Sequence, residues 1–526
     1  MSLNKSSKQK IEIYDTTLRD GSQSEGISYS VQDKIRIAEK LDLLGIDYIE
    51  AGWPGSNPKD LEFFKVAKKM KFKHAKIVAF GSTRRANTKP ADDANLKALV
   101  ESGTQIITIF GKSWDLHVKA ALKVSLDENL RMIADSITYL AKKKKRVIYD
   151  AEHFFDGYKA NPEYALKTIV TAIAAGAETI VLCDTNGGSM PSEVSSIIQA
   201  VAKYCTVRIG IHTHNDTGVA AANALAAVAE GATHVQGTIN GLGERCGNSD
   251  LITIMANLQL KLGYKCLSST QIKNLTETAH YVAEICNMVI PNNQAYVGRS
   301  AFAHKGGIHI NAVMKHSSTY EHVEPESIGN HRRFLTSELS GKSNIIHKAE
   351  QLKYTITKDS PKAKLIHELI QSKENEGYQY EAAEASFDLL IHKTIKQALN
   401  FFELIDYKCV IASREGGKMM SEATVRLNIK GVEEHTASLG DGPVNALDQA
   451  LRKALIPFYP SLKEMHLSDF KVRVLDQKSG TAAKVRVFVE SRDTEKSWTT
   501  VGISTNLIEA SWQALVDAIE YKLWKK

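Results

Sequence analysis

Long apolar segments are absent from this chain of 526 residues. No apolar run approaches the roughly 18 residues that a membrane-spanning helix requires, so we expect no membrane span and no membrane partner. The first ten residues, MSLNKSSKQK, are polar and basic and lack the apolar core of a secretory signal. We therefore expect a cytoplasmic protein in which residues 1–9 form a polar tail.

Cysteine is scarce, and its positions exclude a disulfide framework. The six cysteines are scattered through the chain without the paired spacing of a structural metal site; they are Cys183, Cys205, Cys246, Cys266, Cys286 and Cys409. Most of them lie in apolar surroundings, as reduced thiols of a cytosolic protein do.

A broad basic surface is also missing. The formal net charge is +7, and the one dense basic run is AKKKKR at 141–146. Binding to nucleic acid would need a wider basic face with interleaved aromatic residues. We interpret the run as a solvated helix end that leads into a strand, and we expect no nucleic-acid partner.

The first half of the chain alternates between short β-branched runs and amphipathic helical stretches. Residues 30–45 illustrate the helices, with Ser30 as cap, Asp33 at the capping-box position and Gly45 as the stop. Their expected apolar face comprises Val31, Ile35, Ala38, Leu41 and Leu44. The predicted strands are residues 10–15, 48–52, 76–80, 105–110, 146–152, 179–184, 208–214 and 234–239.

Eight strand–helix units in succession predict an α/β fold, a closed (β/α)₈ TIM barrel over residues 10–268. A doubly wound open sheet is the alternative, but no G-x-G-x-x-G follows the first strand, and GLGERCG has the wrong spacing. Helical linker subdomains are expected over 269–400. Residues 401–526 predict an α+β domain in which a strand–strand–strand–helix unit is duplicated, because 436–451 and 500–515 align at an offset of 64.

Polar residues with chemical potential follow the predicted strands, where barrel enzymes place their active sites. His212 and His214 are two apart in an extended strand, so both imidazoles point the same way. Asp20, after the first strand, adds a carboxylate to a mixed nitrogen and oxygen site that suits Zn²⁺, Mn²⁺, Co²⁺ or Fe²⁺. Asn248 is either a weaker fourth ligand or a helix N-cap. Arg19 is either a substrate-binding group or a salt bridge between neighbouring strands.

Three motifs resemble one enzyme family. DTTLRDGSQ at 15–23, HTHND at 212–216 and NGLGERCGN at 240–248 are similar to the acyl-CoA Claisen enzymes. This family includes the 2-isopropylmalate, citramalate and homocitrate synthases, with hydroxymethylglutaryl-CoA lyase as a more distant member. FAHKGGIHINAV resembles the second part of the synthases. The stretches EAGWPGSNPKD, FGSTRRANTKP, FGKSWDLHV and DAEHFFDGYKANP look most similar to the long form of the citramalate synthases.

The resemblance implies condensation of acetyl-CoA with pyruvate and water to give (R)-citramalate and CoA, a first step of isoleucine biosynthesis. It implies a divalent metal ion (Mn, Zn, Co or Mg), His304 as the catalytic base with Tyr320 nearby, and a homodimer. It also implies that the C-terminal domain senses isoleucine or leucine. In this scheme Arg19 stabilises the developing alkoxide, Glu152 orients the base or a water, and Thr185 binds the substrate carboxylate. Asp184 is expected to hold structure.

Other functions fit parts of the pattern. A 2-isopropylmalate synthase acting on 2-oxoisovalerate would differ only in the oxo-acid pocket, which the sequence does not map. A lyase running the Claisen step backwards would not need the duplicated C-terminal domain. An iron oxygenase would use the same two-histidine, one-carboxylate ligand set. A scaffold protein would leave Asp20, His212, His214, Arg19 and His304 without a purpose.

Overall fold

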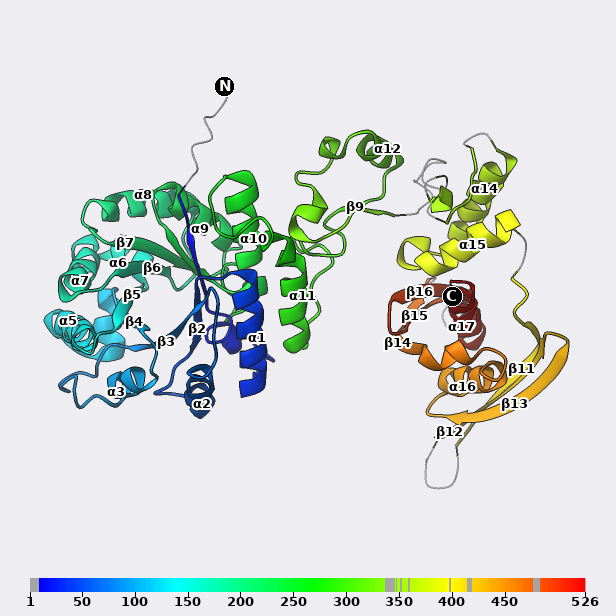
Figure 1. The fold of residues 1–526 in the computed structure, drawn as a ribbon, viewed down its shortest axis with the longest axis horizontal. Coiled ribbons are helices and arrows are strands. Elements are labelled where there is room, and N and C mark those ends of the chain that lie inside the picture. Colours follow the sequence, from blue (N-terminus) through cyan, green and yellow to red (C-terminus); the bar gives the residue numbers. More distant parts are fainter. Residues whose placement is uncertain are drawn as a thin grey trace. The chain divides into compact units, whose positions relative to one another are not determined.

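The computed structural model describes residues 9–335, 346, 348–350, 352–357, 360–396, 399–413, 419–475 and 483–525. The predicted polar tail therefore lies, apart from Gln9, outside the described residues. The chain forms two compact units, Met1–Phe302 with His322–Arg332, and Ala303–Glu321 with Arg333–Lys526 (Figure 1). Within the described ranges, no helix combines the length and the apolar character that crossing a membrane would require.

The first unit is a closed parallel barrel of eight strands, as predicted. Each strand pairs with the next along the chain, and β1 also pairs with β8 and closes the ring. The strands are β1 (Glu12–Asp15), β2 (Tyr48–Gly52), β3 (Lys76–Ser82), β4 (Ile106–Lys112), β5 (Arg146–Glu152), β6 (Thr179–Asp184), β7 (Arg208–Thr213) and β8 (His234–Gly237). All eight predicted strands are present, with ends that shift by no more than two residues.

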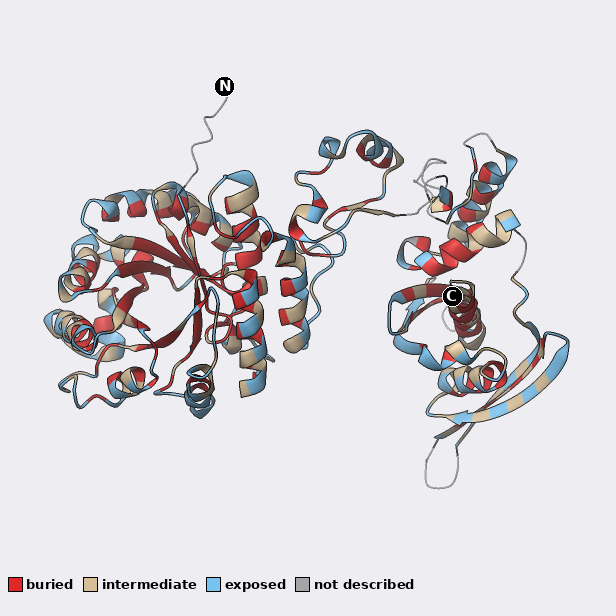
Figure 2. Cartoon of the chain, viewed as in Figure 1, coloured by how far each residue is buried: buried red, intermediate tan, exposed pale blue. Residues whose placement is uncertain are grey.

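Helices surround the barrel and cover the outer face of its strands, which are buried almost throughout (Figure 2). They are α1 (Val31–Leu44), α2 (Pro58–Ala67), α3 (Ala94–Glu101), α4 (Asp115–His117), α5 (Leu126–Lys142), α6 (Phe154–Ala160), α7 (Pro162–Ala175), α8 (Pro191–Ala202), α9 (Ala220–Ala229), α10 (Leu251–Ala256) and α11 (Leu275–Ile285). One continuous apolar core fills the layer between strands and helices.

Helix α1 begins and ends as the sequence predicts. The Ser30 side chain accepts the Asp33 backbone N–H and the Asp33 carboxylate accepts the Ser30 N–H, which completes a capping box. Gly45 ends the helix in the left-handed conformation, with φ 94°. The predicted apolar face was partly wrong: Ile37 is fully buried, whereas Val31 and Ile35 are only half-buried, because the buried stripe is rotated toward Ile37.

The barrel interior is packed below its C-terminal rim. A second, smaller core cluster lies inside the ring of strands and consists of Tyr14, Tyr48, Val78, Ile106, Ile148, Val181 and Cys183. The interior is therefore no open pore, and space for a ligand is left at the rim.

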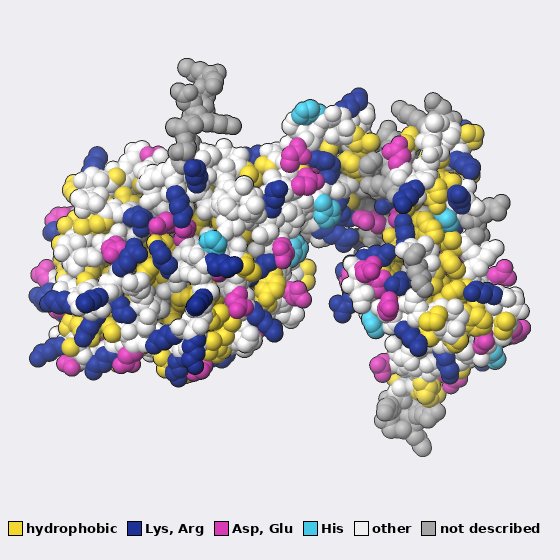
Figure 3. Space-filling model, viewed as in Figure 1, with side chains coloured by type: hydrophobic (Ala, Val, Ile, Leu, Met, Phe, Trp, Pro, Cys, Tyr) yellow, Lys and Arg dark blue, Asp and Glu magenta, His cyan; other side chains and the backbone are white. Residues whose placement is uncertain are grey.

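The basic run at 141–146 has the position that the sequence predicts. It spans the end of α5 and the turn into β5, and residues 141–144 are exposed. Lys and Arg side chains are interspersed with Asp and Glu over the visible face of the barrel (Figure 3). The six cysteines are all free, in agreement with the prediction of reduced thiols.

The second unit begins with a short segment around His304. It comprises β9 (Ala303–His304), α12 (Gly307–Lys315) and β10 (Arg333–Phe334), and β10 pairs in parallel with β9. Two helices follow, α14 (Pro361–Glu376) and α15 (Glu384–Lys396). Both contribute to a core that also contains Val501 and Ile503.

The C-terminal part repeats one unit of three antiparallel strands and a helix. The first copy is β11 (Glu403–Ser413), β12 (Met419–Ile429), β13 (Val432–Gly440) and α16 (Pro443–Leu455). The second is β14 (His466–Val474), β15 (Val485–Arg492), β16 (Ser497–Ser504) and α17 (Leu507–Trp524). The two helices start 64 residues apart (507 minus 443), which confirms the predicted duplication. Both helices share one apolar core.

Candidate active site

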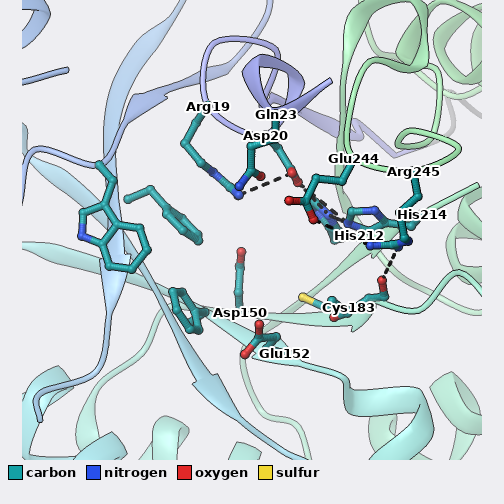
Figure 4. Close-up of a pocket in the computed structure, with 14 residues that line it drawn as sticks. Arg19, Asp20, Gln23, Asp150, Glu152, Cys183, His212, His214, Glu244 and Arg245 are labelled. Atoms are coloured by element: carbon teal, nitrogen blue, oxygen red, sulfur yellow. Dashed lines mark hydrogen bonds and ion pairs between the residues drawn. The ribbon is translucent and has the colours of Figure 1, made fainter. Parts of the chain in front are cut away.

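A cavity of about 250 Å³ opens at the C-terminal ends of the barrel strands, where barrel enzymes carry out their chemistry (Figure 4). Six residues singled out from the sequence line it together: Arg19, Asp20, Glu152, Thr185, His212 and His214. The remaining lining residues are Gln23, Trp53, Phe80, Phe110, Asp150, Cys183, Glu244 and Arg245.

Asp20, His212 and His214 converge at one side of this cavity. His212 Nε2 lies 3.3 Å from Asp20 Oδ2 and 3.2 Å from His214 Nε2, and His214 Nε2 lies 3.9 Å from the same carboxylate oxygen. All three side chains are buried, and their ligand atoms lie within 4.8 Å of one another. Asp20 reaches the histidines because β8 pairs with both β1 and β7.

The protonation states of Asp20 and His214 suit ligation of a cation. At His212, burial by itself would lower the pKa, but the Asp20 carboxylate beside it raises the pKa above its ordinary value. Burial opposes ionisation of Asp20, but Arg19 and His212 hold the pKa of its carboxyl far below the ordinary value. Burial and the neighbouring His212 lower the pKa of His214 to about 4, so His214 is neutral at pH 7. An ionised carboxylate and a neutral imidazole are the forms in which these side chains bind metals.

Asn248 lies beside this cluster. A single antiparallel β-bridge pairs its backbone with that of His214. Its amide nitrogen donates to the Leu242 carbonyl at 3.0 Å, while its buried Oδ1 has no hydrogen-bond partner among the described residues. A buried amide oxygen without a donor is costly, and a bound cation would satisfy it. The cap of α10 is Asp250, so the N-cap interpretation of Asn248 is wrong.

Arg19 forms the salt bridge that the sequence allowed, while its role as a substrate-binding group stays a prediction. Its Nε donates to Glu50 Oε1 at 2.5 Å, which is the salt bridge between neighbouring strands. Glu50 in turn accepts from the Tyr14 hydroxyl at 2.5 Å. The guanidinium lines the cavity and lies 3.6 Å from Asp20. Burial by itself would lower the pKa of Arg19, but Glu50 and Asp20 outweigh this effect and raise the pKa above its ordinary value. Arg19 is a fixed cation at the rim.

Three aromatic rings form the wall opposite the histidines. Trp53 meets Phe80 and Phe110 edge-on, with ring centroids 5.8 and 5.7 Å apart, and Phe80 stacks on Phe110 at 5.5 Å. Trp53 Nε1 donates to Asn95 Oδ1 at 2.7 Å, which fixes the indole. This wall, the aromatic wall, comes from the ends of β2, β3 and β4.

Glu152 and Thr185 lie on the rim between the two sides. Glu152 forms an ion pair with Lys112, and the Thr185 hydroxyl oxygen accepts the His153 backbone N–H at 2.9 Å. That bond leaves the Thr185 hydroxyl proton available to a ligand. Asp184 has the structural role that we expected, since its carboxylate accepts from the Ser189 hydroxyl at 3.0 Å and from the Ser189 N–H at 3.2 Å.

His304 and Tyr320 belong to the second unit. His304 is buried, and its Nε2 lies 3.0 Å from Glu321 Oε1. Tyr320 is exposed, and its ring stacks on His309 with centroids 4.1 Å apart. The expected roles of these two residues therefore remain predictions, whereas the buried partner of His304 is a finding that sequence reasoning missed.

Sequence reasoning also missed the inner carboxylates of the barrel. Asp150 points into the cavity, and burial together with Glu50 raises its pKa to about 7 (Figure 4). Its position two residues before Glu152 in β5 is the signal that could have found it, because the two side chains share a face. Two further buried residues were missed, and for each the signal is a polar side chain within a buried strand. They are the carboxylate of Glu50 in β2 and the amide of Gln236 in β8.

Comparison with known proteins extends this picture along the chain. A family model described as HMGL-like matches residues 10–282. A model described as homocitrate synthase post-HMGL domain-like matches 296–375, and one described as LeuA allosteric (dimerisation) domain matches 381–523.

Full-length relatives agree with these models. The chain is 55% identical to an (R)-citramalate synthase of Aquifex aeolicus over 98% of both chains. It is 54% identical to one of Geobacter sulfurreducens, again over 98% of both. Identity to a 2-isopropylmalate synthase of Shewanella sediminis is 32%, over 96% of this chain and 94% of that one. The chain therefore belongs to the HMGL-like family and, within it, to the family of (R)-citramalate synthases.

Proposed function

We propose that this protein condenses acetyl-CoA with pyruvate and water to give (R)-citramalate and CoA, as a first step of isoleucine biosynthesis. The observation that carries the proposal is the convergence of Asp20, His212 and His214 beside the Arg19 guanidinium in one cavity. A 2-oxo acid offers a carboxylate and a keto oxygen, which match this pairing of a cation site with a fixed positive charge.

Asp20, His212 and His214 would hold a divalent ion, with Asn248 Oδ1 as a further oxygen donor. Two imidazoles, a carboxylate and an amide suit Mn²⁺, Zn²⁺ or Co²⁺, and Mg²⁺ less well. When bound, such an ion supplies Lewis acidity to the keto group of the substrate.

Arg19 has the charge and the rigidity to stabilise an oxyanion. During attack on the keto carbon, negative charge develops on the keto oxygen, and a guanidinium already fixed by Glu50 meets it without reorganising. Thr185 supports binding of the substrate carboxylate, since its hydroxyl proton is not used by the His153 contact.

A base must remove a proton from the methyl group of acetyl-CoA before the new carbon–carbon bond forms. We assign this role to His304, with Tyr320 as a companion and Glu152 as a group that orients the base or a water. Hydrolysis of the thioester then releases CoA and makes the overall reaction irreversible.

Pyruvate is favoured over 2-oxoisovalerate by the aromatic wall. Trp53, Phe80 and Phe110 are packed against one another and fill the side of the cavity next to Arg19. A methyl group needs less room there than an isopropyl group, and each methylene is worth about 1–3 kcal/mol in such a pocket. A 2-isopropylmalate synthase is the alternative.

The direct test is release of the free thiol of CoA from acetyl-CoA by the purified full-length chain. Pyruvate, 2-oxobutyrate and 2-oxoisovalerate are compared side by side, and the product is identified by chiral chromatography. We expect the highest kcat/KM with pyruvate and formation of (R)-citramalate. A preference for 2-oxoisovalerate would favour the alternative, and no thiol release with any 2-oxo acid would refute both.

A second function, regulation by an amino acid in a homodimer, is supported by the match of residues 381–523 to an allosteric (dimerisation) domain. The two helix starts of the duplicated unit differ in capping. Asn506 Oδ1 accepts the Ile508 and Glu509 N–H groups at the start of α17, whereas Gly442 offers no side chain at the start of α16. The turn before α16 is the better place for an amino acid's carboxylate.

The β11–β13 sheet supports the dimer. One of its faces packs on α16, while Val410 and Leu439, which lie opposite Glu422 on either side of it, are exposed on the other face. Calorimetric titration of the full-length chain with isoleucine, leucine and valine tests the regulation, and analytical ultracentrifugation tests the dimer. Indifference to millimolar concentrations of all three amino acids would refute amino-acid sensing, and a monomer would refute the dimer.

A further inference from the structure

A single glutamine links the histidine cluster to the far side of the barrel. Gln236, in β8, lies between His212 of β7 and Asp150 of β5. His212 Nδ1 is 2.9 Å from Gln236 Oε1, and Gln236 Nε2 donates to Asp150 Oδ1 at 3.1 Å. All three side chains are buried. Strands β5 and β8 are not neighbours in the ring, so this bridge crosses the barrel interior.

The two ends of the amide determine what each partner does. Because Nε2 donates to Asp150, the carbonyl oxygen of Gln236 is the end that faces His212. A carbonyl oxygen only accepts, so His212 must carry its hydrogen on Nδ1. In the neutral form that binds a metal, the lone pair of the ring is then on Nε2, the atom that lies 3.3 Å from Asp20 and 3.2 Å from His214.

Packing alone does not account for a glutamine at this position. Its amide is completely buried, and an apolar side chain of similar volume would avoid the desolvation that a buried amide must overcome. Both ends of the amide are instead used, one by a predicted metal ligand and the other by the carboxyl group that points into the cavity.

We infer that Gln236, anchored by Asp150, is a positioning residue of the metal site: it sets the tautomer and the orientation of His212. This inference rests on the proposed metal site of Asp20, His212 and His214. Partners that orient a ligating histidine in this way typically change metal affinity by about 10- to 100-fold when they are removed.

The experiment compares two substitutions at this position. Gln236→Met keeps a side chain of similar length but offers His212 no acceptor. Gln236→Glu keeps an oxygen acceptor for the Nδ1 hydrogen. Gln259→Met is the matched control, because Gln259 Oε1 accepts only the backbone N–H groups of Cys266 and Leu267, away from the cavity.

Each full-length variant is treated with a chelator and titrated with Co²⁺, whose visible absorption reports both affinity and ligand geometry. Circular dichroism verifies the fold. We expect Gln236→Met to raise the Kd for Co²⁺ at least about tenfold and to change the spectrum. Gln259→Met should stay within about threefold of the wild type. Gln236→Glu keeps the acceptor but loses the N–H group that donates to Asp150, so its affinity should lie between those of the wild type and Gln236→Met.

The outcomes separate this inference from the proposed function. Unchanged affinity and spectrum in a folded Gln236→Met variant would overturn the role of Gln236 while leaving the metal site intact. Equal losses in Gln236→Met and Gln236→Glu would overturn it as well, because the acceptor would then be irrelevant. A wild-type chain that binds no Co²⁺ would overturn the metal site itself, and this inference with it.

Discussion

The guanidinium carbon of Arg19 lies 3.7 Å from the centroid of the Phe80 ring. This stacking joins the two sides of the cavity, since Arg19 also pairs with Glu50 and approaches Asp20, while Phe80 belongs to the aromatic wall. A cation held from one side by a carboxylate and from the other by an aromatic face has little freedom to move. Under the proposed function, this one contact couples the catalytic charge to substrate selection.

Replacing Arg19 tests this coupling. Lysine keeps the charge in Arg19→Lys, but an ammonium cannot donate to Glu50 and present a planar face to Phe80 at the same time. We expect kcat to fall about a hundredfold, whereas affinity for Co²⁺ stays unchanged. Arg146→Lys is the control, because Arg146 pairs with Glu178 away from the cavity. Steady-state release of CoA measures the effect, and a variant with more than half the wild-type kcat would contradict the role of Arg19.

The aromatic wall leads to a prediction on selectivity. Phe110→Val removes a ring that stacks on Phe80, the ring against which the Arg19 guanidinium lies. We expect kcat/KM for 2-oxobutyrate and 2-oxoisovalerate, relative to pyruvate, to rise about tenfold. Phe72→Val is the matched control, a half-buried phenylalanine outside the cavity. Competition assays with mixed 2-oxo acids measure the ratio of the kcat/KM values. An unchanged ratio would show that the aromatic wall does not determine selectivity.

Removal of the metal should abolish turnover. A strong chelator is expected to inactivate the wild-type chain, and Mn²⁺, Co²⁺, Zn²⁺ or Mg²⁺ to restore it. Asp20→Asn should lower kcat at least about a hundredfold. It should also abolish the rise in melting temperature that added metal gives the wild type, because a ligand of the folded state stabilises it. Asp92→Asn, at an exposed position, is the control. An Asp20→Asn variant with full activity would refute the assignment.

A pH-dependent contribution to stability is expected at the opposite end of the barrel. Glu12 lies 3.0 Å from Arg208, and, although burial opposes ionisation, His234 and Arg208 lower its pKa to about 2. A lowered pKa means that the folded state favours the ionised form. The stabilisation is complete above the ordinary pKa of about 4.5 and is lost as the pH falls toward 2.

Glu12→Gln should therefore lower the free energy of unfolding by about 2 kcal/mol at pH 6. The difference between variant and wild type should shrink steadily as the pH is lowered toward 3. Calorimetry of the barrel transition at several pH values measures it. A difference that is constant with pH would show that Glu12 acts by packing rather than by its charge.

The barrel and the histidine cluster could be predicted from the sequence because local rules determine them. Buried parallel strands appear as β-branched runs, and residues two apart in a strand share a face, which placed His212 and His214 together. Closure of the ring then implied the approach of Asp20. Each of these steps uses only spacing along the chain and one topological rule.

The rest of the cavity depends on contacts between strands, and spacing does not encode them. The sequence does not distinguish Phe80 and Phe110 from ordinary core residues. Their contact depends on the β3–β4 register, which places Ser82 opposite Phe110. A glutamine neither ionises nor acts as a common metal ligand, so the sequence gives no reason to single out Gln236. The role inferred for it follows only from its two partners on β5 and β7. The buried Glu321 beside His304 depends in the same way on the fold of residues 303–321.

The pairing of β1 with β8 also has a consequence for folding. Asp20 and His212 are 192 positions apart (212 minus 20), and they become neighbours only when the first strand joins the last. Contacts of such large sequence separation carry a high entropic cost of loop closure and form late. The two histidines are brought together by their own strand, whereas the Asp20 carboxylate reaches them only when β1 pairs with β8. An ion bound by the Asp20 carboxylate and by the histidines would stabilise the pairing of β1 with β8. Local opening of β1 and loss of the ion would then occur together.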